Sequence, residues 1–118
     1  MKAFQLAYAL AMDVFRASQG FPREERYSLT DQIRRSSRSV AANLAEGYRK
    51  RNYEKLFVLK LVEVDGEVAE TQVWLDMAHD CGYIEDAVHA DLSLRATEVG
   101  RLIGWMIRHP ERFKPVAE

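Results

Sequence analysis

The residues best suited to chemistry lie between Gln32 and Lys50, in a segment with the composition of one amphipathic helix. Apolar residues recur there every three or four positions, and basic residues occupy the other sides. Arginine guanidinium groups bind phosphates and carboxylates through paired hydrogen bonds. The segment therefore predicts a cationic surface. The candidate nucleic-acid-binding residues are Arg34, Arg35, Arg38, Arg49, Lys50 and Arg51.

Two other interpretations fit the same arginines. A solvated helix face carries basic residues near its carboxyl end because they complement the helix dipole. Alternatively, the arginines pair with the acidic line Glu63, Glu67 and Glu70, either within the chain or across subunits. The residues alone do not separate these alternatives from phosphate binding.

A second polar line runs along the same segment, with members three, four or seven residues apart. Its members are Gln32, Ser39, Asn43 and Glu46. An amide in the middle of a helix either points to water or satisfies a buried polar contact. We expect Asn43 to join a hydrogen-bond network between helices. Glu46 has no histidine in register, so this line does not predict a general acid–base pair.

The rest of the chain offers little to an enzyme. It contains no phosphate-binding glycine loop, no Ser-His-Asp set and no paired Cys or His spacing of a zinc site. The single cysteine, Cys81, cannot form an internal disulfide, and we expect it to be a small core residue. We therefore predict a protein without catalytic residues, metal or cofactor.

Hydrophobic periodicity predicts four helices separated by breaks near Gly20, Gly47 and Gly82. The first has Tyr8 among its inward-facing residues, the second is capped by Ser28, and the third runs from a cap at residue 52 to residue 81. The fourth begins near residue 85 and ends before residue 110, where a loose tail follows. The predicted fold is all-α, an antiparallel up-down-up-down four-helix bundle forming one domain over residues 1–118.

The third helix has two apolar stripes on different sides. One stripe includes Phe57, Leu61 and Val64, and the pattern does not determine which of the two stripes faces the core and which faces a neighbouring subunit. A long apolar stripe is seldom left in water, so the second predicts self-association. The alternative is a central helix with a wide core face. The candidate oligomer-interface residues are Leu59, Val62, Gly66, Ala69 and Val73.

Composition and charge describe a globular protein with an uneven charge distribution. Hydrophobic residues make up 47% and charged residues 30% of the 118 residues. No apolar run reaches the roughly 18 residues of a membrane span, so we expect a cytoplasmic protein without membrane contact. Residues 1–51 hold ten Lys or Arg against five Asp or Glu, a net charge of +5, and residues 52–118 hold seven against thirteen, a net charge of −6. The basic half can meet nucleic acid or pair with the acidic half.

The segment at residues 21–47 resembles the signature of the four-helix bundle proteins known as 23S rRNA intervening-sequence proteins, which are encoded in insertions in bacterial 23S ribosomal RNA genes. Ser36 and Ser37 depart from that signature, in which small apolar residues are commoner at these positions. The matching residues are Phe21, Pro22, Glu25, Leu29, Gln32, Ile33, Arg34, Arg35, Ser39, Asn43, Ala45, Glu46 and Gly47.

The resemblance implies a four-helix bundle assembled as a ring-shaped homo-oligomer, with a homopentamer as the expected form. It also relates the chain to the accessory variability determinant proteins of diversity-generating retroelements, which are thought to engage nucleic acid and a reverse transcriptase. The expected function is therefore a non-catalytic bundle that binds RNA or DNA through the second helix. The alternative is a scaffold that binds a protein partner, with arginines forming salt bridges between subunits or to that partner.

Overall fold

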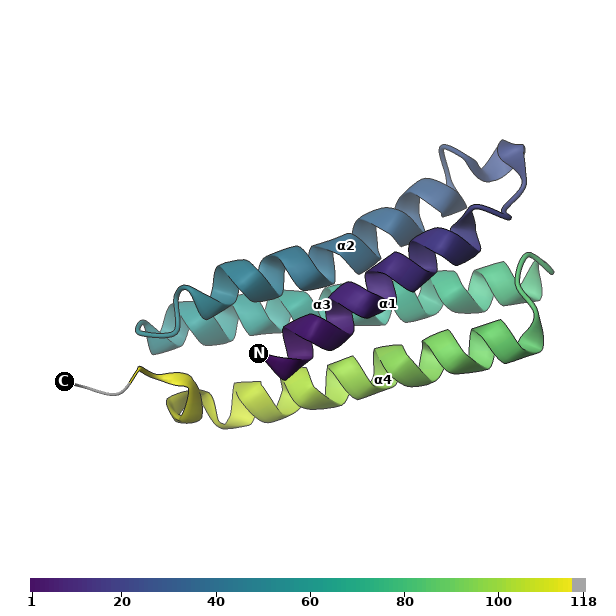
Figure 1. The fold of residues 1–118 in the computed structure, drawn as a ribbon. Coiled ribbons are helices and arrows are strands. Elements are labelled where there is room, and N and C mark those ends of the chain that lie inside the picture. The colour runs from purple at the N-terminus through teal and green to yellow at the C-terminus, as the bar shows by residue number, and fades with distance from the viewer. Residues whose placement is uncertain (116–118) are drawn as a thin grey trace.

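The computed structural model describes residues 1–115, and residues 116–118 of the predicted domain lie outside them. The described residues form helices and no strands, which confirms the predicted all-α class (Figure 1). The elements are α1 (Lys2–Ser18), η1 (Arg23–Glu25), α2 (Leu29–Tyr48), α3 (Glu54–Asp80), α4 (Asp86–Arg108) and η2 (Pro110–Phe113).

The four long helices pack around one hydrophobic core. Helix α2 contacts α1 and α3, and α4 contacts α3 and α1. The resulting body measures 53 × 25 × 18 Å. No helix within residues 1–115 combines the length and apolar content that crossing a membrane requires. The largest fully buried apolar side chains are Val14, Ile33, Val40, Leu44, Phe57, Leu61, Val64, Leu75, Val99 and Ile103.

Helix α2 begins where predicted, but its cap differs from the expected one. The Ser28 side chain makes no capping hydrogen bond, and its hydroxyl donates to Glu25 Oε1 at 2.6 Å. The Leu29 amide points to the same oxygen at 3.4 Å, and the Tyr83 hydroxyl donates to Glu25 Oε2 at 2.8 Å. A carboxylate preceding the helix therefore takes the role expected of the serine, because it offers two acceptor oxygens near the positive end of the helix.

Helix α3 ends at Asp80, one residue before the predicted end, and Gly82 follows its cap as the sequence predicts. Gly82 has a φ of 78°, its amide donates to the His79 carbonyl, and the Tyr83 amide donates to the Ala78 carbonyl. This pair of hydrogen bonds is a Schellman motif, which favours glycine at the left-handed position. Cys81 just precedes it and is exposed, so its predicted place in the core was wrong.

Three further expectations need correction. Helix α3 begins at Glu54 and not at a cap on residue 52, because a turn closed by the Tyr53 amide on the Lys50 carbonyl comes first. Tyr8 is 57% exposed, since α1 turns Ala7, Leu10 and Val14 toward the core. The tail is held at Phe113, whose ring lies 5.9 Å from that of Phe57.

The contact between α2 and α3 is close and partly polar. The Ser36 and Thr71 hydroxyl oxygens lie 2.9 Å apart, and both side chains are buried. A Cβ added at Gly47 would lie 3.0 Å from Cγ of Lys60, so a larger residue would push that side chain away. Ser36 thus departs from the family signature at a position where its hydroxyl meets a partner on the next helix.

Candidate functional site

Arg34, the first of the six candidate basic residues, joins α2 to α1. Its Nε donates to Ser18 Oγ at 2.7 Å, and its guanidinium carbon lies 4.7 Å from the centre of the Phe15 ring. Ser18 is buried, and Arg34 is half-buried. A guanidinium held by a hydrogen bond and a cation–π contact is less free to bind the phosphates of a nucleic acid.

Arg35 and Arg38 are both exposed, but their surroundings differ. The Arg35 side chain is 74% exposed and lies 3.7 Å from Asp31 in a loose ion pair along the helix. The Arg38 guanidinium carbon lies 5.5 Å from the centre of the Phe15 ring. Among residues 1–115, Arg38 makes no ion pair with a carboxylate. Arg38 is therefore the more available cation on this side of α2.

The basic cluster after α2 is also divided. Lys50 Nζ lies 3.3 Å from Glu46 Oε1. Arg51 donates to the Tyr48 carbonyl at 3.0 Å and places its guanidinium 4.2 Å from the centre of the Tyr48 ring. Arg49 is exposed and, within the described part of the chain, forms no ion pair. The chain itself thus engages two of these three residues.

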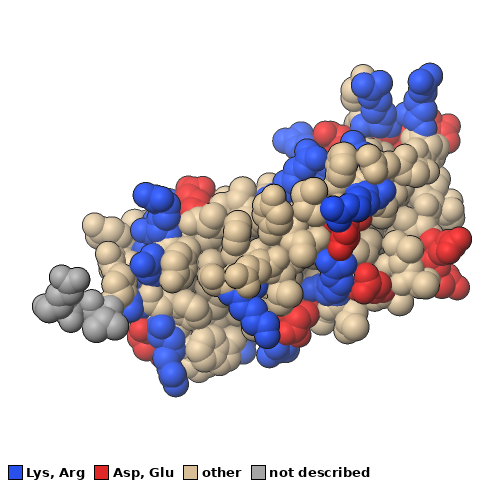
Figure 2. Space-filling view, viewed as in Figure 1, with Lys and Arg blue, Asp and Glu red and all other residues tan. Residues whose placement is uncertain are grey.

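The six residues consequently do not present six free charges in one surface. Intramolecular partners engage Arg34, Lys50 and Arg51. Arg38 extends from the side of α2 that faces α1, and Arg49 extends from the carboxyl end of α2. On the face drawn in Figure 2, Lys and Arg side chains stand apart, several beside Asp or Glu, with other residues between them. This distribution weakens the prediction that the six residues form one cationic surface.

The predicted polar line of α2 reaches α3 at one point. Glu46 Oε2 lies 3.3 Å from Lys60 Nζ, and hydrogen bonds from Lys60 and Lys50 lower the pKa of Glu46. Asn43 donates at 2.9 Å to the Ser39 carbonyl of its own helix, so its expected role between helices was wrong. Gln32 lines a separate depression with Trp74. The hydroxyl pair of Ser36 and Thr71 adds a buried hydrogen bond between α2 and α3.

An apolar groove runs between α1 and α2, with a volume of about 380 Å³. Alanines supply much of its surface, and Tyr8 and Met12 stand exposed beside them. Arg38 contributes to this groove, while Arg49 lines a smaller adjoining depression with Phe4. We call this surface the α1–α2 groove, lined by Phe4, Tyr8, Ala11, Met12, Arg38, Ala41, Ala42 and Ala45.

The two predicted stripes of α3 have opposite environments. Phe57, Leu61 and Val64 of the first stripe are buried in the core. All five candidate interface residues of the second stripe are exposed, including Leu59 at 59% and Val62 at 51%. The described bundle therefore leaves an apolar line in solvent along α3. We call it the α3 ridge, formed by Leu59, Val62, Gly66, Ala69 and Val73.

Acidic residues flank the α3 ridge. Helical spacing places Glu63 and Glu70 on the α2 side and Asp65 on the α4 side. Glu63 pairs with Lys60 at 3.2 Å, and Glu70 accepts from the Trp74 indole at 3.2 Å. Burial raises the pKa of Glu67, and the neighbouring carboxylates of Glu70 and Glu63 raise it further.

These carboxylates receive no arginine from within the described chain. The arginines of α2 point toward α1 and solvent, whereas Glu63, Glu67 and Glu70 lie on α3. The predicted pairing of the two sets within one chain was therefore wrong for residues 1–115. Pairing across subunits remains a prediction.

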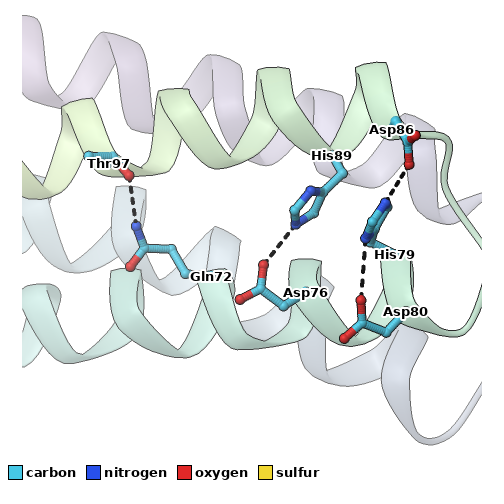
Figure 3. Close-up of polar contacts among 7 residues, drawn as sticks. All are labelled: Gln72, Asp76, His79, Asp80, Asp86, His89 and Thr97. Atoms are coloured by element: carbon cyan, nitrogen blue, oxygen red, sulfur yellow. Dashed lines mark hydrogen bonds and ion pairs between the residues drawn. The ribbon is translucent and has the colours of Figure 1, made fainter.

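Two histidines, one from α3 and one from α4, come together between these helices (Figure 3). The rings of His79 and His89 stack with their centres 4.2 Å apart. His79 Nε2 lies 2.7 Å from Asp86, and His89 Nε2 lies 2.7 Å from Asp76. The hydrogen bond to Asp86 is the main cause of the raised pKa of His79. The sequence did not predict the stacking of these rings or their carboxylate partners, because the residues come from two helices.

The histidine cluster does not provide a metal centre. Within residues 1–115, no group of three or more His, Cys, Asp or Glu side chains is arranged to hold a metal ion. Each imidazole is instead directed at a carboxylate, and the two rings stack on each other. The arrangement is suited to electrostatic contact between α3 and α4.

The structure is thus a small all-α bundle with an apolar ridge and an apolar groove open to solvent. The sequence profile of the 23S rRNA-intervening sequence protein family matches residues 1–104. The chain belongs to this family, which confirms the membership predicted from residues 21–47. Among curated proteins, no sequence matches the chain.

A crystal structure supports the fold. It is that of a protein of unknown function from the S23 ribosomal protein family of Bacteroides thetaiotaomicron, with a TM-score of 0.81 and 22% sequence identity. The similarity covers 90% of this chain and 98% of that one. At this identity the likeness establishes a shared fold, and the relation to retroelement accessory proteins remains a prediction.

Proposed function

We propose that the protein is a non-catalytic interaction module that assembles with copies of itself through the α3 ridge. The observation that carries this proposal is the exposure of Leu59, Val62 and Val73 along one side of α3, while the opposite side fills the core. An apolar line of this length in water favours association, because covering it removes apolar surface from solvent. Any function then resides in the assembly or in a partner that the assembly recruits.

The bundle order and the ring belong to the same proposal. Helices adjacent in sequence pack on one another through short connections, which supports an antiparallel up-down-up-down order. A ring-shaped homo-oligomer follows when each copy uses two different surfaces, and the family resemblance implies five subunits. The proposal also predicts no catalysis. Incubation of the protein with RNA and a divalent metal ion tests this, and we expect no cleavage of the RNA.

Sedimentation velocity of the wild-type chain tests the assembly. We expect a species of several 13.6 kDa chains, and we expect Val73→Asp to sediment as a single chain. Leu94→Asp is the matched control, because Leu94 is 70% exposed on α4 and lies outside the ridge. A wild-type protein that sediments as one chain at micromolar concentration would exclude the proposed function.

Nucleic-acid binding is the second candidate function. The observation in its favour is that Arg38 and Arg49 are exposed cations without a carboxylate partner in residues 1–115, and that Arg35 is held loosely. Repetition of these residues around a ring would multiply the phosphate contacts available to an RNA or DNA strand. The family resemblance supports this candidate as well.

A salt titration of binding to a generic RNA or DNA separates the two candidates. If phosphates are bound, affinity falls steeply with salt, and Arg38→Ala or Arg49→Ala each reduces the slope by about one. Arg101→Ala is the control, because that residue pairs with Glu98 on α4. Affinity that does not change with salt would refute phosphate binding and leave the protein-interaction module.

A further inference from the structure

We infer that the α1–α2 groove is the receptor for the α3 ridge of the next copy, so that the chain assembles head to tail through two different surfaces. This inference rests on the proposed self-assembly and names the surface that α3 meets. Three features carry it: the size of the groove, the complementary charges around groove and ridge, and the mismatch that would arise if two ridges met.

The groove fits a helix ridge because small side chains form much of its surface. Ala41, Ala42 and Ala45 extend no further than a methyl group, so a neighbouring helix can approach closely. Leu59, Val62 and Val73 project from the ridge at helical spacing and supply branched side chains to fill the groove. Gly66 lies among them and has no side chain, and the space where a Cβ would be is open. The middle of the ridge therefore projects less than its two ends.

The charges around the two surfaces have opposite sign. Arg38 lines the groove, and Arg49 lines the adjoining depression at the end of α2. Glu63, Glu70 and Asp65 flank the middle of the ridge, and Lys55 is the cation beside its Leu59 end. Neither arginine has a carboxylate partner within residues 1–115, and no arginine reaches these acids within the chain. Docking the ridge in the groove brings the unpaired cations to the acidic border.

The same charges disfavour a symmetric contact. Two ridges placed together would bring two acidic borders into contact, and like charges in an interface oppose association. Two grooves placed together would juxtapose arginines and leave alanine surfaces without side chains to fill them. A pairing of unlike surfaces repeats from copy to copy and produces a closed ring or a filament. Docking of the ridge in the groove also covers Arg38, so that this residue is not available to bind phosphates in the assembly.

Two single substitutions separate the surfaces. Val62→Asp places a carboxylate on the ridge and leaves the groove intact, and Ala42→Glu places one in the groove and leaves the ridge intact. Both positions are exposed in the single chain, so the helices tolerate the changes. We expect each variant to remain monomeric where the wild type assembles. Leu94→Asp adds the same charge elsewhere and is expected to assemble normally.

Mixing the two variants gives the decisive result. One ridge and one groove remain functional in an equimolar mixture, so we expect a dimer with one chain of each variant in sedimentation and native mass spectrometry. If ridges instead pair with ridges, Ala42→Glu assembles like the wild type, and the mixture contains no such dimer. Either observation overturns the inference.

The outcomes distinguish this inference from the proposed function. A monomeric wild type contradicts both, whereas an assembling wild type with an assembling Ala42→Glu variant contradicts the groove alone. Helix content by circular dichroism checks that each variant folds. If Ala42→Glu does not fold, Met12→Glu on the α1 side of the groove replaces it, because Met12 is exposed. Assembly of a folded Met12→Glu variant to the wild-type mass also overturns the inference.

Discussion

Replacement of Arg34 by alanine is expected to destabilise the fold, because this arginine ties α2 to α1. Its Nε donates to the buried Ser18 hydroxyl oxygen at 2.7 Å, and its guanidinium lies over the Phe15 ring. A hydrogen bond from a charged group contributes about 1.5 kcal/mol at a half-buried site, and a cation–π contact adds about 0.5 kcal/mol. The expected loss is therefore about 2 kcal/mol in the free energy of unfolding.

Urea denaturation followed by circular dichroism measures this loss. All variants are compared at one protomer concentration, since assembly adds a concentration-dependent contribution to stability. Arg35→Ala is the matched control, and we expect it to change the free energy of unfolding by about 0.5 kcal/mol or less, because the side chain is 74% exposed. Equal effects of the two substitutions, or an Arg34→Ala variant as stable as the wild type, would refute the structural role of Arg34.

Three further predictions follow from polar contacts and backbone geometry. Thr71→Val should lower the free energy of unfolding by about 1 kcal/mol, because it removes the hydrogen bond to Ser36. A double-mutant cycle with Ser36→Ala, measured by urea denaturation, should show that the two effects are coupled. Additive effects would argue against the hydrogen bond between the two hydroxyl groups. Gly82→Ala should lower the free energy of unfolding by about 1 kcal/mol, because a φ of 78° is unfavourable for a residue with a Cβ. An unchanged melting temperature would contradict this prediction. The hydrogen bond to Asp86 should raise the pKa of His79 above 6.5, so the stabilisation from protonated His79 is complete below pH 6.5 and is lost as the pH rises through the raised pKa. NMR titration should show a lower His79 pKa in Asp86→Asn than in the wild type. An unchanged pKa would exclude the hydrogen bond to Asp86 as the cause.

The helices could be predicted from the sequence because each carries its own periodic pattern. The pattern also separated the two stripes of α3, but which of them is buried and which is exposed comes from the packing of the helices. It was wrong for Tyr8 of α1, because two apolar lines compete on this helix: Tyr8 lies toward solvent, and the line containing Ala7 and Leu10 faces the core. Which line is buried depends on how closely the neighbouring helices approach, and one helix alone does not contain that information.

The candidate site was harder to predict because its contacts join distant residues. A helical wheel of α2 groups Arg34 with Arg38, but Arg34 meets Ser18, sixteen residues earlier, on another helix. The stacked pair of His79 and His89 likewise joins α3 to α4. Ser36 was noted only as a departure from the family signature, since its partner Thr71 lies on α3. Sequence spacing describes one helix at a time, whereas these contacts arise from packing.

The most direct test of the central claim measures whether assembly covers the α3 ridge. Hydroxyl-radical footprinting of the wild-type protein compares the oxidation rates of Leu59 and Val62 with that of Leu94, all about half exposed or more in the single chain. We predict that the two ridge residues are protected in the wild type, that Leu94 reacts freely, and that Leu59 regains reactivity in Val73→Asp. Oxidation of Leu59 and Val62 in proportion to their single-chain exposure would contradict the claim.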